Sequence, residues 1–273
     1  MQPKMSHVHT YDAIRKCIYC GKGDNFENLT TEHIIPESLG GTIKLPSASC
    51  SDCQKFTSAF EGRNAGRLFR PVRRQFDFPS KSRGRKQKEL RQNETFRVIV
   101  DGVKRDLPAK DYPGLLITFE FPYPTALMGI PPTFENFAGG ISIATLPDFG
   151  LRLNALRARY GNAVSFPTSG NSEDVGRLLA KIGYSYAVAE LGLNVFKPYV
   201  LGIIRGHDVS LLRHLVGGDL TKSPAGDDLH EIELVPPGAL GFPNLVVVRI
   251  RLFANCPGTA TYLVVVGEIG TLT

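Results

Sequence analysis

The chain has 273 residues, of which 42% are hydrophobic and 21% are charged, and this composition excludes an intrinsically disordered protein. No apolar run is long enough to span a bilayer, and residues 1–16 lack the apolar core of a signal peptide. We therefore expect a cytoplasmic protein with no membrane partner. The net charge of +6 favours polyanionic partners, and the length allows one large domain or two smaller ones.

Four of the five cysteines form two Cys-x-x-Cys pairs, Cys17 with Cys20 and Cys50 with Cys53. This spacing lets a tight turn aim both sulfurs of a pair at one ion, and thiols stay reduced in the cytoplasm, so we expect zinc rather than disulfides. Four thiolates leave no open coordination position on zinc, which would then be structural and would not activate water. Cys256 remains as an odd, buried thiol.

The candidate catalytic residues lie between the two cysteine pairs. Glu32 and His33 stand at the end of a predicted strand and are followed by the turn Gly40-Gly41. An imidazole titrates near neutral pH and suits a general base, whereas a carboxylate suits Mg²⁺ or Mn²⁺. Neighbouring residues of a strand point to opposite faces, so the pair can share one site only where the strand ends or bulges.

A helix is predicted over 51–70, directly after the second cysteine pair, and Pro71 is expected to end it. We expect its apolar face to consist of Phe56, Ala59, Phe60 and Leu68. Gln54, Ser58 and Glu61 recur at helical spacing and share another face.

This arrangement resembles the HNH endonuclease family, whose fold runs strand, loop, strand and helix around one divalent ion. The matching residues are Cys17-x-x-Cys20, Glu32-His33-Ile34-Ile35-Pro36, Gly40-Gly41 and Cys50-x-x-Cys53 with the helix that follows. The resemblance implies that Glu32 binds a catalytic Mg²⁺ or Mn²⁺ ion and that His33 is the general base. Gln54 stands where the family often has a metal-binding asparagine, and Ser47 corresponds to the family's middle asparagine. Glu61 is a further candidate ligand.

Basic residues concentrate just after the predicted helix, where residues 63–91 hold eleven Lys and Arg against two acidic residues. We expect the region 71–93 to be a basic linker that contacts a phosphate backbone. The candidate nucleic-acid-binding residues are Arg73, Arg74, Lys81, Arg83, Arg85, Lys86 and Lys88. A solvated linker with no partner is the alternative. We expect DNA as the partner, although this charge pattern does not distinguish DNA from RNA.

Residues 94–273 alternate strand-like and helical patterns and are expected to form an α+β domain of unknown function. Strands are predicted at 96–102, 115–121, 230–235, 245–253 and 261–269. A long helix is predicted over 172–193, capped by Ser172, and a shorter one over 208–216 that starts at Asp208. No known catalytic motif occurs in this part, which leaves a homodimer contact or a regulatory partner open.

The fold class predicted from these patterns is α+β. A zinc-stabilised ββα-metal module (residues 1–70) precedes the basic linker and a larger domain (residues 94–273) with antiparallel strands. The function that this implies is metal-dependent hydrolysis of phosphodiester bonds in DNA. The alternative is a zinc module that has lost its catalytic site and only binds nucleic acid.

Overall fold

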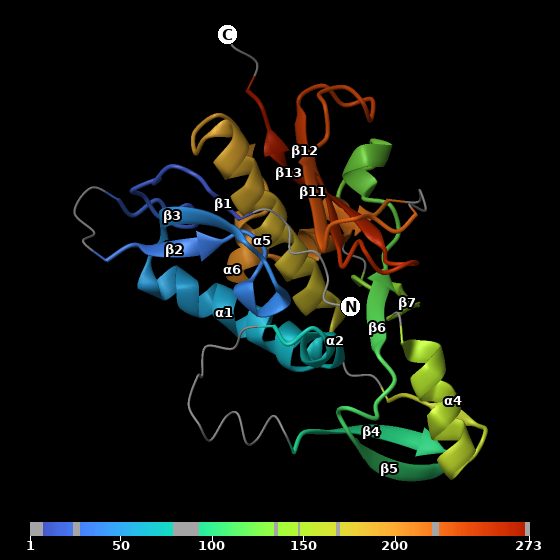
Figure 1. Ribbon diagram of the computed structural model, residues 1–273. Coiled ribbons are helices and arrows are strands. Elements are labelled where there is room, and N and C mark those ends of the chain that lie inside the picture. The colour runs from blue at the N-terminus through green and yellow to red at the C-terminus, as the bar shows by residue number, and fades with distance from the viewer. Residues whose placement is uncertain are drawn as a thin grey trace.

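The computed structural model describes residues 8–23, 28–78, 93–133, 136–146, 148–167, 170–219 and 224–270. It confirms a mixed α+β fold with antiparallel sheets (Figure 1). Its helices are α1 (Ser51–Gly66), α2 (Arg70–Gln75), α4 (Phe149–Tyr160), α5 (Ser172–Leu191), α6 (Leu201–Arg205) and α7 (Leu212–Leu215). Among the described residues, none of these helices is long and apolar enough to cross a membrane.

The N-terminal module has the predicted ββα order. Its sheet consists of β1 (His9–Thr10), β2 (Thr30–His33) and β3 (Ile43–Ser49), with β3 in the centre, and β2 runs antiparallel to β3. The connection from β2 to β3 contains a short 3-10 helix (Glu37–Leu39), and α1 follows β3 directly. The pairing of β2 with β3 is irregular between Thr30 and Glu32, and β2 ends at His33.

The Gly40-Gly41 turn depends on both glycines. Gly40 has φ +85°, a left-handed conformation that side chains with a Cβ rarely adopt. A Cβ on Gly41 would stand only 1.9 Å from the carbonyl oxygen of Ile35. The chain therefore turns tightly enough to return as β3 beside the end of β2.

The buried face of α1 differs from the prediction. Phe60 is buried as expected, but Phe56 is 47% exposed and Ala59 is also exposed. The buried positions are Cys53, Thr57, Phe60, Asn64 and Ala65, because Cys53 must face the other cysteines and so fixes the rotation of the helix.

The predicted end of α1 at Pro71 was also wrong. α1 ends at Gly66, and Pro71 lies in the first turn of α2. Proline is tolerated there because the first amide groups of a helix have no partner within the helix.

The remaining strands form three sheets. The largest has the order β10-β13-β12-β11, with β9 also paired to β13, and comprises β9 (Lys197–Pro198), β10 (Val216–Gly218), β11 (His230–Leu234), β12 (Leu245–Leu252) and β13 (Thr261–Glu268). A second sheet holds β4 (Thr95–Val100), β5 (Val103–Pro108) and β8 (Val164–Ser165), and a third holds β6 (Leu115–Glu120) and β7 (Gly140–Thr145). The strands expected from the sequence are present, whereas β5, β7 and α4 were not predicted.

Helix α5 lies in the middle of the molecule, between the N-terminal module and the large sheet (Figure 1). It packs against α1 on one side and against β12 and β13 on the other, and the buried residues of all these elements form one continuous core. Buried side chains of β4, β5 and α4 form a second, smaller core.

Two predicted helix starts need correction. The side chain of Asn171, rather than that of Ser172, caps α5 by accepting a hydrogen bond from the backbone amide of Glu173. The Ser172 hydroxyl donates instead to the carbonyl of Phe137. The helix expected over 208–216 is a 3-10 turn (Val209–Leu211) followed by α7, and Asp208 makes no capping hydrogen bond there.

His230 joins the large sheet to the N-terminal module and makes folding stability pH-dependent. Its Nε2 donates to the carbonyl of Leu39 (2.9 Å), and its Nδ1 accepts from the amide of Phe253 (3.2 Å), so the ring is neutral. Burial lowers the pKa of His230 from 6.5 to about 4. As the pH falls, the His230 imidazole therefore takes up a proton in the unfolded chain before it does so in the folded one. The contribution of His230 to the free energy of unfolding is complete above pH 6.5 and is lost between pH 6.5 and 4.

We expect the free energy of unfolding to fall by about 3 kcal/mol across that window because of His230. Urea denaturation at a series of pH values measures it. His230→Gln is the control, because an amide can make the same two hydrogen bonds and does not titrate. Equal pH dependence of the two proteins would contradict the assignment.

Candidate functional site

The four paired cysteines converge as the spacing predicted. Their sulfur atoms all lie within 4.8 Å of one another, and Cys17, Cys50 and Cys53 are buried. The Sγ atoms of Cys20 and Cys50 are 3.7 Å apart. A tetrahedral zinc ion with Zn–S bonds of about 2.3 Å requires sulfur atoms about 3.8 Å apart. The donor set and its spacing therefore fit a structural zinc ion.

A small cavity of about 80 Å³ lies between the end of β2 and α1. Glu32 and His33 both line it, which the end of β2 at His33 permits. Gln54, Ser58 and Glu61 line the opposite wall from α1. The structure thus brings the predicted candidate residues Glu32, His33, Gln54 and Glu61 together. Ser47, in β3, is not among the described residues that line this cavity.

The two residues at the end of β2 have different environments. Glu32 is 5% exposed, whereas the side chain of His33 is half-buried and open to the cavity. Burial lowers the pKa of His33 below its usual value, an effect that the neighbouring Glu37 carboxylate partly offsets. The imidazole is therefore mostly unprotonated at neutral pH, the form that can accept a proton.

Lys181 also lines this cavity, although it belongs to α5, which lies outside the N-terminal module. Its Nζ lies 2.5 Å from Oε1 of Glu32 and 2.9 Å from Oε1 of Glu61, and it also donates to the backbone carbonyls of His33 and Ile34. The lysine is 1% exposed. Burial opposes its charge, but the two carboxylates outweigh burial and raise the pKa of Lys181. A charged ammonium therefore bridges the two carboxylates.

The divalent ion that the resemblance implies does not fit this arrangement. The carboxylates of Glu32 and Glu61 are suitable oxygen ligands for Mg²⁺ or Mn²⁺. The ammonium of Lys181, however, stands between them at hydrogen-bonding distance from both. Within the part of the chain that the structure describes, the four cysteines are the one cluster of His, Cys, Asp and Glu groups spaced to hold a metal.

The prediction from sequence missed Lys181, although a signal was present. Lys181 lies three residues after Leu178 and next to Ile182, within the apolar stripe expected for the helix over 172–193. A lysine on the buried face of a helix requires an acidic partner. The sequence could not show which carboxylates those were, since Glu32 lies far away in the chain.

Two of the predicted nucleic-acid-binding residues have contacts within the protein. Arg73 donates to the backbone carbonyls of Ser38 and Ala65. Arg74 lies 3.6 Å from the carboxylate of Glu94. The other candidates, Lys81, Arg83, Arg85, Lys86 and Lys88, lie outside the described residues.

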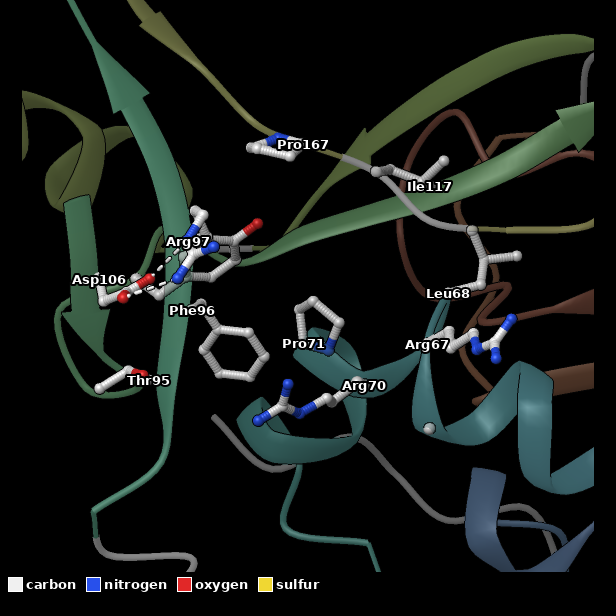
Figure 2. A pocket seen from close by; sticks show the side chains of 12 residues that line it. Arg67, Leu68, Arg70, Pro71, Thr95, Phe96, Arg97, Asp106, Ile117 and Pro167 are labelled. Atoms are coloured by element: carbon white, nitrogen blue, oxygen red, sulfur yellow. Dashed lines mark hydrogen bonds and ion pairs between the residues drawn. The ribbon is translucent and has the colours of Figure 1, made fainter. Parts of the chain in front are cut away.

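A separate, larger cleft of about 510 Å³ lies between the region of Arg67 to Pro71 and strand β4 (Figure 2). Arg70 lies over the ring of Phe96 at 5.0 Å and pairs with Glu94, and Arg97 pairs with Asp106 across β4 and β5. In the sequence, the basic segment 79–92, which lies outside the described residues, connects α2 to β4, the two elements beside this cleft. The cleft contains neither Glu32 nor His33.

Comparison with known families supports the N-terminal assignment. Residues 17–67 match the family model described as HNH endonuclease. The match spans both cysteine pairs, the Glu32-His33 dipeptide and α1, so this segment is similar to the HNH endonuclease family and the predicted resemblance is confirmed. Neither the curated proteins nor the solved structures gave a match. Residues 68–273 lie outside the matched segment.

Proposed function

We propose that this protein is an endonuclease that hydrolyses phosphodiester bonds in DNA, with His33 as the general base. The observation that carries this proposal is the convergence of Glu32 and His33 with Gln54, Ser58 and Glu61 on one cavity. That cavity lies wholly within a module of a nuclease family, apart from Lys181. The half-buried imidazole at the cavity wall supports the role of His33.

The proposed step is attack of a water molecule on phosphorus. His33 accepts a proton from the water as the new oxygen–phosphorus bond forms, and the bond from phosphorus to the leaving 3′ oxygen breaks. General-base catalysis of this kind contributes about 10²- to 10⁴-fold to the rate. The backbone carbonyl of His33 is held by Lys181, which limits the motion of the strand end that carries the imidazole.

The family implies Mg²⁺ or Mn²⁺ as cofactor, which would stabilise charge on the phosphate when bound. We propose Glu32 as its ligand, with Gln54 and Glu61 as the further candidates on α1. As described above, the ion does not fit while Lys181 is in place.

The basic segment supplies the proposed DNA contact. Replacing Arg83, Arg85, Lys86 and Lys88 by Gln should weaken binding to all sequences, because contacts to phosphates carry no base information. The slope of log binding constant against log salt concentration should become less steep by about 0.9 for each lost phosphate contact. Fluorescence anisotropy at several salt concentrations measures this slope.

The matched control replaces exposed lysines elsewhere, namely Lys104, Lys110 and Lys197. Those substitutions should leave the slope nearly unchanged after correction for net charge. An unchanged slope in the segment variant would show that this basic run is a solvated linker.

A second candidate function is a zinc module that binds nucleic acid without cleaving it, and the ammonium of Lys181 between the carboxylates favours it. Supercoiled plasmid incubated with Mg²⁺ or Mn²⁺ separates the two functions when compared with gel-shift binding in EDTA. The nuclease should produce nicked or linear plasmid only with the metal. Retarded but intact plasmid under every condition would establish the binding module.

A further inference from the structure

We infer that Lys181 is an internal cation that competes with the divalent ion for Glu32 and so weakens binding of the ion there. This inference rests on the proposed function only in taking Glu32 as the ligand for the ion. Lys181 belongs to α5, outside the segment that matches the nuclease family. A residue from outside the matched segment therefore lines the cavity and contacts its two carboxylates.

The contacts of the ammonium are complete. Lys181 Nζ has three protons: it donates to the backbone carbonyls of His33 and Ile34, and it lies 2.5 Å from Oε1 of Glu32, whereas Glu61 is held by an ion pair of 2.9 Å. No proton remains for a phosphate group or for water. The lysine therefore serves the cavity as a counter-ion rather than as a group that contacts substrate.

The same face of α5 is directed at the module along its length. Asp174 forms a two-point ion pair with Arg63 of α1, at 2.7 and 2.5 Å, and its carbonyl accepts from Asn64. Tyr184, three residues beyond Lys181, donates to the carbonyl of Ile18 (2.7 Å). Lys181 lies between these two anchors, so its ammonium is held in the cavity by the docking of the whole helix.

A divalent ion and this ammonium cannot both use Glu32. Mg²⁺ binds carboxylate oxygen at about 2.0–2.1 Å, and the Nζ of Lys181 is already 2.5 Å from Oε1 of Glu32. Two cations this close would repel one another strongly in a buried site. Each cation also supplies the positive charge that the buried carboxylates require. Binding of one therefore removes the need for the other.

Mn²⁺ binding to the zinc-loaded full chain tests the inference without nucleic acid, by electron paramagnetic resonance of the free ion. Lys181→Met keeps the length of the side chain and removes its charge. It should bind one Mn²⁺ at least about 10-fold more tightly than wild type, because one positive charge has left the site. Adding Glu32→Gln to Lys181→Met should abolish this binding.

A charge-matched variant covers the case in which Lys181→Met fails to fold. Lys181→Met with Glu61→Gln has the same net charge in the cluster as wild type and leaves Glu32 without its ammonium. It should also gain Mn²⁺ binding, whereas Glu61→Gln alone should not. Thermal unfolding gives a second readout. Mn²⁺ should add little to the Tm of the wild-type protein and should raise the Tm of Lys181→Met.

Equal Mn²⁺ affinity in wild type and in the folded variants would overturn the inference, as would a clear Mn²⁺-dependent rise in the Tm of wild type. The nuclease proposal is separable from it. If Lys181→Met binds Mn²⁺ through Glu32 but no protein cleaves DNA, the inference holds and the nuclease proposal fails. If wild type cleaves DNA and Lys181 has no effect on Mn²⁺ affinity, the reverse is true.

Discussion

Replacing His33 by Ala is expected to lower the rate of DNA cleavage by about 10²- to 10⁴-fold, the usual contribution of a general base. The imidazole lines the cavity beside Glu32, and the contact of His33 with Lys181 uses its backbone carbonyl. The substitution therefore removes the proton acceptor without removing that contact. Zinc content and DNA binding should stay at the wild-type level.

His207→Ala is the matched control, because His207 is exposed and lies outside the cavity. It should cleave at the wild-type rate. Partial recovery of His33→Gly by added imidazole would separate a chemical role of the side chain from a structural one. Full activity of His33→Ala would exclude His33 as the base and would move the assignment towards the binding module.

Replacing Cys50 or Cys53 by Ser is expected to remove zinc and unfold the N-terminal module. Structural zinc contributes on the order of 10–16 kcal/mol in small zinc modules, which is comparable to the whole net stability of a domain, about 5–15 kcal/mol. Both cysteines are buried, and Cys50 is the N-cap residue of α1. Loss of the metal therefore also removes the anchor at the start of the helix that carries Gln54 and Glu61. Wild-type protein should contain one zinc per chain.

Cys256→Ala serves as the control for these variants. Cys256 is buried but is not part of the four-cysteine cluster, so this variant should keep one zinc per chain. Elemental analysis and circular dichroism report metal content and folding. Wild-type protein purified without chelator and free of zinc would contradict the account of the module.

The parts of the site that the sequence predicted are those fixed by short-range spacing. The two sulfurs of each Cys-x-x-Cys pair lie close together because each pair lies within one turn, and Glu32 and His33 share a cavity because β2 ends at His33, before the Gly40-Gly41 turn. These features need few long-range contacts to define them. A sequence motif can therefore describe them.

The failures came from contacts between distant segments. Phe56 and Phe60 are equally apolar, but Phe60 lies on the face of α1 that packs against α5 and is buried, whereas Phe56 is 47% exposed. Lys181 is 148 residues from His33 in the chain, yet it contacts the end of β2. The packing of α5 between the module and the large sheet, which no local pattern encodes, places Lys181 beside Glu32 and Glu61.

The most direct test of the account is cleavage of supercoiled plasmid over a range of Mn²⁺ concentrations by wild type and Lys181→Met side by side. The account predicts that both proteins cleave and that Lys181→Met reaches half of its maximal rate at a lower Mn²⁺ concentration. His33→Ala should remain inactive throughout the range. Intact plasmid at every Mn²⁺ concentration with both proteins, although both bind DNA, would contradict the claim that this module is a nuclease.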